Sequence, residues 1–366
     1  MNYMFIRQGV IMKKFFLYFI GFVIIFFIAP AICTATPKKS KETVAQEEIQ
    51  ENQQENQNLV NEQTDSTEQK NIEQENQEGK NQDITIKLLH SATGEVEELS
   101  LNQYLYGVVS SEMPASYEIE ALKAQAIVAR TYTIYQIKHN SNKHENADIC
   151  DNYECCQAWI SKEDRLAKWS AEEAESNWNK IVEAVDSTTN KIVTYNGEAI
   201  NAFFHSNSGG VTESSVNVWG GVDYPYLKSV ETAGEDGYKQ YSSQVQLSKQ
   251  ELQDKLKEKY PDCEIDFSQE NCIQILEYTT SGRVKTIKFG NKEIAGTEAR
   301  TILGLKSTNF SFSINGDTVI FEVTGYGHGV GMSQTGADTM AKSGANCEEI
   351  IKHFYTDVEI AELKSF

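Results

Sequence analysis

The segment SSEMPASYEIEALKAQAIVART, which ends at Thr131, places the carboxylate of Glu112 close in sequence to two cations. Glu112 lies at a Met-Pro turn, and the residues after it have the pattern of a long helix that carries Lys123 and Arg130. A helix turns by about 100° per residue, so residues seven apart lie on nearly the same face. We therefore expect Lys123 and Arg130 to face one groove together with Glu112.

Glu112 is the candidate for acid–base chemistry. A general acid needs a carboxyl group whose pKa is raised by a partly apolar site, and Met113 and Tyr117 could supply one. Lys123 and Arg130 would lower that pKa if they lay beside the carboxylate, because a nearby cation favours the ionised form. The interpretation therefore requires both cations to face a ligand. The alternative is that Glu112 is a helix cap or a surface acid.

A cluster of soft ligands follows the long helix. His144, Cys150, Cys155 and Cys156 lie within thirteen residues, and thiolate and imidazole groups suit zinc. A disulfide loop is the alternative in an oxidising compartment, although adjacent cysteines cannot both serve one simple local bridge. If His144 and two thiolates bind zinc, the fourth ligand could be water, Cys155 or His139. Cysteine-rich ligation favours a structural role.

Two glycine-rich loops, residues 205–210 (HSNSGG) and 327–334 (GHGVGMSQ), each follow an apolar run that predicts a strand. Glycine lets the backbone approach a ligand closely, and neutral polar side chains match sugar hydroxyls. Tight turns with satisfied polar side chains are the alternative. Tyr226 and Lys228 could add a stacking face and a cation, and Trp219 could stack on a sugar or belong to the core. The candidate binding residues in the loops are His205, Asn207, Ser208, His328, Ser333 and Gln334.

The elements that would position these residues are segregated along the chain. Because helices and strands do not alternate, we predict an α+β fold in which mixed helices and antiparallel sheets form a groove around one long helix. The expected helices are 101–109, 118–138, 169–187 and 346–355, with a hairpin over 84–89 and 95–99 and strands over 191–195, 199–206, 284–289 and 317–323.

The charge of the chain excludes one class of partner. The 366 residues carry 33 Lys and Arg against 53 Asp and Glu, a formal net charge of −20. Binding to nucleic acid rests on neutralising phosphates, so an acidic body of this kind is a poor candidate for it. An anionic ligand would need a local basic patch. Cys263 and Cys272 could form a disulfide or be free thiols.

The N-terminal region reads as an anchor and a tether. Residues 15–33 are uncharged and long enough to cross a membrane, and Lys13 and Lys14 before them favour a cytoplasmic N-terminus. A cleaved signal segment is the alternative, and both interpretations place the rest of the chain outside the cytoplasm. We thus expect an anchor over residues 1–35, a disordered Gln/Asn/Glu-rich tether over 36–83 and one catalytic domain over 84–366.

Three separated motifs resemble the stage II sporulation protein D family. They are SEMP with the following ALKAQAIVARTY, FHSNSGG with its WGG, and GYGHGVGMSQTGA. The resemblance implies a peptidoglycan lytic transglycosylase that cuts between N-acetylmuramic acid and N-acetylglucosamine in strands stripped of peptides. It also implies a single-pass protein of the septal or engulfing membrane, which works during engulfment of the forespore with an amidase and a further membrane protein.

The resemblance also implies roles for residues. Glu112 would be the catalytic acid, and the groove residues would be Lys123, Arg130, Tyr226 and Lys228. Some family members hold zinc on one His and two Cys after the long helix, and His144, Cys150 and Cys156 occupy that place here. Cys155 is an additional thiol.

The implied reaction explains how a single carboxylate can suffice. Hydrolytic glycosidases usually use two carboxyl groups, whereas a lytic transglycosylase uses the sugar's own C6 hydroxyl as nucleophile and leaves a 1,6-anhydro product. A wall-binding module that activates a partner amidase without its own catalysis is the first alternative. A zinc amidase or peptidase is the second, although no HExxH motif occurs.

Overall fold

The computed structural model describes residues 84–139 and 143–363. The expected anchor and tether lie outside these residues. Within the described ranges, no helix combines the length and apolar character that crossing a membrane requires. The described chain is α+β, with several small antiparallel sheets, as predicted. That residues 84–366 act as one catalytic domain stays a prediction.

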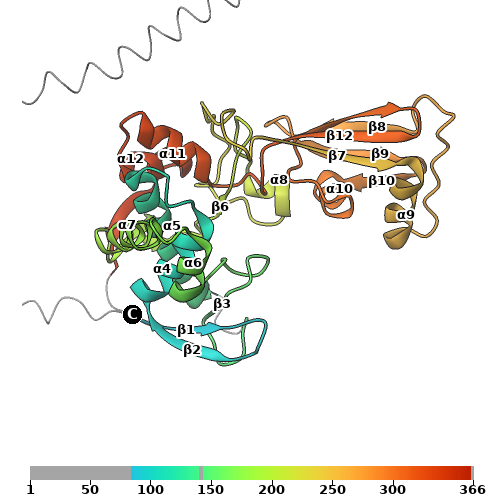
Figure 1. Cartoon of the computed structure of the whole chain (residues 1–366). Helices are drawn as coiled ribbons and strands as arrows, with labels where there is room; N and C mark the ends of the chain where they lie inside the picture. The colour runs from blue at the N-terminus through green and yellow to red at the C-terminus, as the bar shows by residue number, and fades with distance from the viewer. Residues whose placement is uncertain (1–83, 140–142, 364–366) are drawn as a thin grey trace, which may run out of the picture. The chain divides into compact units, whose positions relative to one another are not determined.

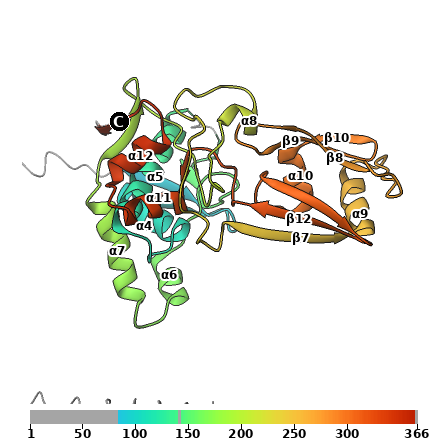
Figure 2. The ribbon, with the colours of Figure 1, turned by 90° about the horizontal axis from the view of Figure 1, so that it is seen from above.

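A first core surrounds the long helix α5 (Ile119–His139). Almost every residue of α5 from Ala121 to Ile134 is buried, because neighbouring helices cover it on several sides. These neighbours are α4 (Leu101–Glu112), α7 (Ala174–Asp186), α11 (Gln334–Lys342) and α12 (Cys347–Phe354). Figure 1 and Figure 2 show the five helices gathered together.

Helix α4 begins at a well-formed cap and ends at the candidate acid. The Ser100 hydroxyl accepts a hydrogen bond from the Gln103 N–H at 3.3 Å, while the Gln103 side chain accepts one from the Ser100 N–H at 3.0 Å. The helix runs to Glu112, three residues beyond the predicted end. Met113 then takes an extended conformation, which suits a residue that precedes proline.

Short strands complete the first core. The predicted hairpin forms from β1 (Thr85–Leu89) and β2 (Val96–Ser100), and β1 also pairs in parallel with β3 (Ile149–Cys150). The expected strand 199–206 is wrong as one strand: it is split into β5 (Glu198–Ala199) and β6 (Phe204–His205), because the Phe203 N–H turns back to the Asn201 carbonyl oxygen at 2.9 Å. The remaining strands are β4 (Lys191–Tyr195), β13 (Met332–Ser333) and β14 (Glu359–Glu362).

Residues 242–324 build a second core of their own. Two three-stranded antiparallel sheets enclose it together with two helices, and Figure 1 shows these elements grouped. The elements are β7 (Ser242–Ser248), α9 (Lys249–Lys259), β8 (Ile273–Tyr278), β9 (Val284–Phe289), β10 (Lys292–Ala295), α10 (Gly296–Leu303), β11 (Phe310–Asn315) and β12 (Thr318–Thr324). One sheet has the order β11-β12-β7 and the other β10-β9-β8.

The predicted helix 169–187 is partly wrong. Its helical part is α7, and a separate helix, α6 (Lys162–Lys168), precedes it. The Ser161 hydroxyl caps α6 by accepting from the Asp164 N–H at 3.1 Å, and Trp169 ends the helix in an extended conformation. Helix α6 packs against α4 and α7. A further short helix, α8 (Ser215–Trp219), follows the first glycine-rich loop.

Candidate functional site

Glu112 stands at the edge of a pocket of about 470 Å³. The turn after α4 forms one wall, and α6 with the start of α7 forms another. Glu112 is half-buried, and its carboxylate forms no ion pair within the described residues. The other residues that line the pocket are Ser111, Met113, Pro114, Ala115, Ser116, Arg165, Trp169, Glu173, Asn177 and Gln240.

Two neutral groups donate hydrogen bonds to the Glu112 carboxylate. The Ala158 N–H lies 3.0 Å from Oε1, and the Gln334 amide nitrogen lies 3.3 Å from Oε2. Burial raises the pKa of Glu112, and these two donors offset only part of that rise. The predicted combination of an accessible carboxyl group and a raised pKa is therefore present.

The expectation that Lys123 and Arg130 share a groove with Glu112 is wrong. Arg130 is fully buried and donates to the carbonyl oxygens of Thr188 at 2.7 Å and Val185 at 3.3 Å, near the end of α7. Lys123 lies 2.8 Å from Glu120 on its own helix. The two cations do share one face of α5, but other parts of the chain cover that face, and neither lines the pocket.

Arg165 is the cation that the pocket does contain. Its guanidinium carbon lies 4.5 Å from the centre of the Trp169 ring, and both residues line the pocket with Glu112. Arg165 was not predicted because residues 157–168 were assigned to no element, and Trp169 was predicted only as the first residue of the helix 169–187. The Ser161 cap, followed by Asp164, was the available signal for a helix that starts there.

The two glycine-rich loops lie against each other. Strands β6 and β13 pair in parallel, with Phe204 opposite Met332 and His205 opposite Ser333. Asn207 and Tyr326 also exchange backbone hydrogen bonds at 3.0 and 2.8 Å. The next residue after β13 is Gln334, which reaches Glu112. The two loops therefore lie side by side, and one of them contacts the acid.

Most of the polar loop residues serve a buried carboxylate and not an open surface. Glu235 is 2% exposed and accepts hydrogen bonds from the hydroxyls of Ser208, Ser333 and Thr335. Asn207 donates in turn to the Thr335 hydroxyl at 2.9 Å. The expected substrate contacts of Asn207, Ser208 and Ser333 are therefore wrong in this structure, because all three are buried and satisfied internally.

Burial disfavours the charged form of the two loop histidines. Burial lowers the pKa of His205 to about 3 and that of His328 well below its ordinary value. His205 is buried and lies 3.1 Å from the Val330 carbonyl oxygen through Nδ1, whereas His328 is half-buried. The His328 ring lies 5.1 Å from Trp219, whose side chain is 50% exposed. Neither histidine lines the Glu112 pocket.

Tyr226 and Lys228 separate in the structure. Tyr226 is buried, and its hydroxyl accepts a hydrogen bond from the Asn201 N–H at 3.0 Å, so it supports the first core and offers no open stacking face. Lys228 is exposed. Neither residue lines the pocket of Glu112.

The expected metal ligands come together. One ligand atom from each of His144, Cys150, Cys155 and Cys156 lies within 4.8 Å of the other three. Ligands of a tetrahedral zinc with bonds of roughly 2.0–2.3 Å lie about 3.5–3.8 Å apart, so a small contraction would close this site. The three cysteines are free thiols, against the alternative of a disulfide loop, and His139 lies elsewhere. Cys155 thus completes a donor set of three sulfurs and one nitrogen.

The metal cluster is connected to the candidate acid through two residues of backbone. Gln157 follows Cys156, is buried, and donates to the hydroxyls of Thr133 at 3.0 Å and Tyr104 at 3.2 Å. Ala158 comes next, and its N–H binds Glu112. The position of that N–H therefore depends on the same loop that carries the three thiols.

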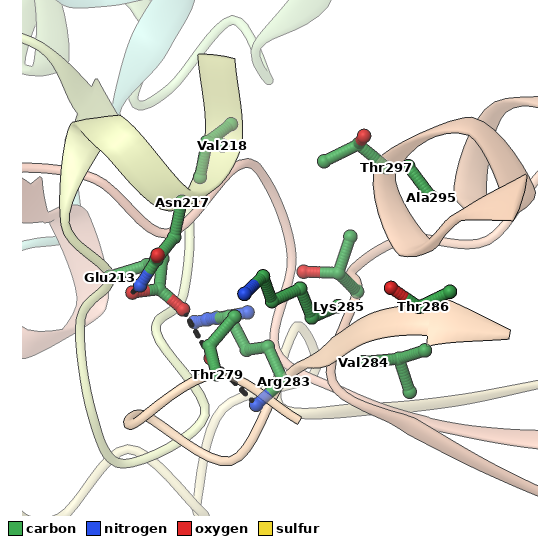
Figure 3. A pocket seen from close by; sticks show the side chains of 11 residues that line it. Glu213, Asn217, Val218, Thr279, Arg283, Val284, Lys285, Thr286, Ala295 and Thr297 are labelled. Atoms are coloured by element: carbon green, nitrogen blue, oxygen red, sulfur yellow. Dashed lines mark hydrogen bonds between the residues drawn. The ribbon is translucent and has the colours of Figure 1, made fainter. Parts of the chain in front are cut away.

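A second pocket, of about 290 Å³, lies where residues of the two cores meet. Figure 3 shows the Thr279 hydroxyl donating to the carboxylate of Glu213, at 2.6 Å, and accepting from the Arg283 backbone N–H, at 3.2 Å. Arg283 is 1% exposed and donates to the carbonyl oxygen of Ser208 at 2.6 Å and the hydroxyl of Ser307 at 2.7 Å. These contacts join the first glycine-rich loop to the second core.

Comparison with known proteins decides the family. The profile of the stage II sporulation protein family matches residues 90–195. The chain is also 36% identical, over 284 residues, to the stage II sporulation protein D of Bacillus subtilis (strain 168). The aligned region covers 77% of this chain and 80% of that protein. The chain belongs to the stage II sporulation protein D family.

Two further relatives are informative. The stage II sporulation protein D of Bacillus amyloliquefaciens is 34% identical over 288 residues, or 78% of this chain and 81% of that protein. A protein of Bacillus subtilis named amidase enhancer is 29% identical over 302 residues, or 69% of this chain and 39% of that protein. The resemblance that the sequence motifs suggested is thus confirmed. The part matched by the family profile includes Glu112 and the whole metal cluster.

Proposed function

We propose that this member of the stage II sporulation protein D family is a lytic transglycosylase. It cleaves the bond between N-acetylmuramic acid and N-acetylglucosamine in peptide-free glycan strands and leaves 1,6-anhydro ends. The observation that carries the proposal is the setting of Glu112: a carboxyl group at an open pocket, with a raised pKa and no ion pair within the described residues. A carboxyl group with a raised pKa keeps its proton to a higher pH than an ordinary one, and it can then donate that proton as a general acid.

Glu112 would act twice in the reaction. It first donates its proton to the glycosidic oxygen as the bond from that oxygen to C1 of the muramic acid ring breaks. The carboxylate then takes the proton from the C6 hydroxyl as the C6 oxygen bonds to C1. The Ala158 N–H and the Gln334 amide steady the ionised form between the two steps. Intramolecular attack removes the need for a second carboxyl group.

A bound zinc ion would be held by His144, Cys150, Cys155 and Cys156. Four protein ligands leave no open position for substrate, which is the arrangement of a structural site. The ion would supply rigidity to the loop that presents the Ala158 N–H to Glu112.

The biological setting follows from the same proposal. The enzyme acts on peptidoglycan outside the cytoplasm, attached by a single-pass anchor to the septal or engulfing membrane of a sporulating cell. An amidase that strips the peptides would supply its substrate, and a membrane scaffold protein would hold the machinery together. Nucleic acid is not among the partners proposed.

Replacement of the acid tests the mechanism. Glu112→Gln keeps the shape of the side chain but has no proton to exchange, so release of 1,6-anhydro products from purified denuded strands should fall by roughly 10²–10⁴-fold. Mass spectrometry of the products measures this. Glu118→Gln, which removes an exposed carboxylate six residues away, is the control and should retain activity. Formation of anhydro products by Glu112→Gln at the wild-type rate would contradict the proposal.

A second function is favoured by the relative named amidase enhancer. In that case the chain binds glycan strands and activates a partner amidase without cleaving sugar bonds itself. Glu112→Gln would then leave amidase stimulation intact, and the wild-type chain would yield no anhydro ends. The same pair of proteins, assayed with and without an amidase, separates the two functions.

A further inference from the structure

Arg165 differs from the other arginines that the structure describes. The guanidinium groups of Arg130, Arg283 and Arg300 all donate hydrogen bonds to oxygen atoms of the chain. Within the described ranges, the Arg165 guanidinium donates no hydrogen bond and forms no ion pair, although its side chain is half-buried at the pocket. A partly buried cation that no oxygen atom of the chain meets lacks the partner that usually offsets its desolvation, so such a group points to a ligand that supplies the acceptor.

The surroundings of Arg165 hold its charge in the pocket. The Trp169 ring lies against the guanidinium, with 4.5 Å between the carbon atom and the ring centre, and this contact covers a face while the N–H donors lie in the plane. The other acid of the pocket, Glu173, accepts from the Ser170 hydroxyl at 3.0 Å and forms no ion pair with Arg165. The guanidinium is thus available to an anion that enters.

We propose that Arg165 recognises the carboxylate of the lactyl group on the N-acetylmuramic acid residue that Glu112 attacks. This inference rests on the proposed function for the identity of the ligand. Among the sugars of the strand only muramic acid carries such a carboxylate, and the group is free only after its peptide has been removed. A guanidinium matches a carboxylate with two parallel hydrogen bonds.

The assignment gives the pocket a reason to select peptide-free strands. In a chain of net charge −20 an anionic sugar needs a local cation, and Arg165 is the cation that lines the pocket. A peptide joined through an amide bond removes the negative charge and adds bulk at the same atom. Selectivity would therefore come from one contact beside the acid and not from the Lys123 and Arg130 pair.

Neutral strands test this inference. Denuded strands are compared with the same strands after their carboxylates have been converted to methyl amides, and binding to the full chain is followed by tryptophan fluorescence, which does not require turnover. Wild-type protein should bind the free-carboxylate strands roughly ten- to a hundredfold more tightly. Arg165→Gln should lose that preference, and Arg165→Lys should keep part of it.

Lys168→Gln is the matched control, because it removes one positive charge from the same helix at an exposed position outside the pocket. It should bind like the wild type. Thermal melting of each variant establishes that it is folded. In the cleavage assay, Arg165→Gln should raise KM for free-carboxylate strands far more than it lowers kcat.

The outcomes distinguish this inference from the proposed function. Equal binding of both strand types by the wild type, or an unchanged preference in Arg165→Gln, overturns the role of Arg165 even if anhydro products form. An equal loss of affinity for both strand types in Arg165→Gln overturns it as well. If the preference depends on Arg165 but no anhydro product forms, the carboxylate contact stands and the lytic mechanism falls.

Discussion

Glu112 shows how its immediate contacts set the chemistry of one carboxyl group. Burial raises its pKa, while the Ala158 N–H and the Gln334 amide lower it by stabilising the ionised form. The balance matters because the proposed reaction needs the proton at the start and the anion in the middle. The two donors therefore tune the acid as well as orient it.

Gln334→Met tests this tuning. The change removes the amide that donates to the ionised Glu112 carboxylate, so the pKa of Glu112 should rise. Since the reaction starts from the protonated acid, the loss of activity at alkaline pH should move to higher pH. The pH profile of kcat/KM on denuded strands measures the shift.

Gln240→Met is the control for that experiment, because it removes an amide from the same pocket without a hydrogen bond to Glu112. Its profile should stay in place. A shift of the Gln334→Met profile to lower pH would contradict the role given to this amide.

Helix α5 shows how an element can satisfy a sequence pattern and still serve another purpose. Lys123 and Arg130 do lie seven residues apart on one helical face. Helix α7 packs against α5, and Arg130 donates to backbone carbonyl oxygens at the end of α7. Lys123 forms an ion pair with Glu120 on its own helix. The cation of the pocket comes from α6, a helix of seven residues.

The loop that carries His144 and the three cysteines should bind zinc. Purified protein should contain one zinc ion per chain, and Cys150→Ser should lose it, because a thiolate ligand is removed. Where free zinc stands at about a hundred times its Kd, the bound ion stabilises the folded chain by about 2.7 kcal/mol, and chelation should lower the free energy of unfolding by that amount. Metal analysis and urea unfolding measure both effects.

Cys263→Ser provides the matched control, since it alters a buried free thiol in the second core and should leave the zinc content unchanged. Zinc retained at one ion per chain by Cys150→Ser would exclude the four-ligand site described here.

At the scale of the whole molecule, a few buried polar contacts hold the two cores together. Arg283 belongs to the second core and donates to the carbonyl oxygens of Ser208 and Val211 in the first glycine-rich loop. Glu213, on the other side, accepts from the hydroxyls of Thr279 and Ser281. The glycine-rich loops thus serve the joint between the cores more than they serve an open surface.

Arg283→Met should therefore be costly. The side chain is 1% exposed, and its loss leaves buried carbonyl oxygens without donors, so the free energy of unfolding should fall by roughly 1–3 kcal/mol for each oxygen left unsatisfied. Lys285→Gln, two residues along, breaks only a half-exposed ion pair with Glu277 and should cost less than about 1 kcal/mol. Calorimetric melting compares the two, and equal effects would argue against the joint.

Several features could be read from local pattern because local physics decides them. The hairpin of β1 and β2, the long helix α5, strand β4 and the helix after Asn346 follow from periodicity, capping and turn residues. The metal cluster was also visible, since its ligands are close in sequence. No Gly or Pro marks the turn between Asn201 and Phe203, which is why the two short strands of residues 198–205 were taken for one.

The α+β class, the family and Glu112 as the candidate acid could all be predicted from the sequence, because each depends on residue types and short spacings. The polar residues that meet Glu112 could not be predicted, because they come from distant parts of the chain. Gln334 lies 222 positions away in the chain and Arg165 comes from a separate helix, while Arg130, Asn207, Ser208 and Ser333 turn inward. Whether a polar side chain faces a ligand or a buried partner depends on the segments that fold over it, and spacing along the chain carries no record of those segments.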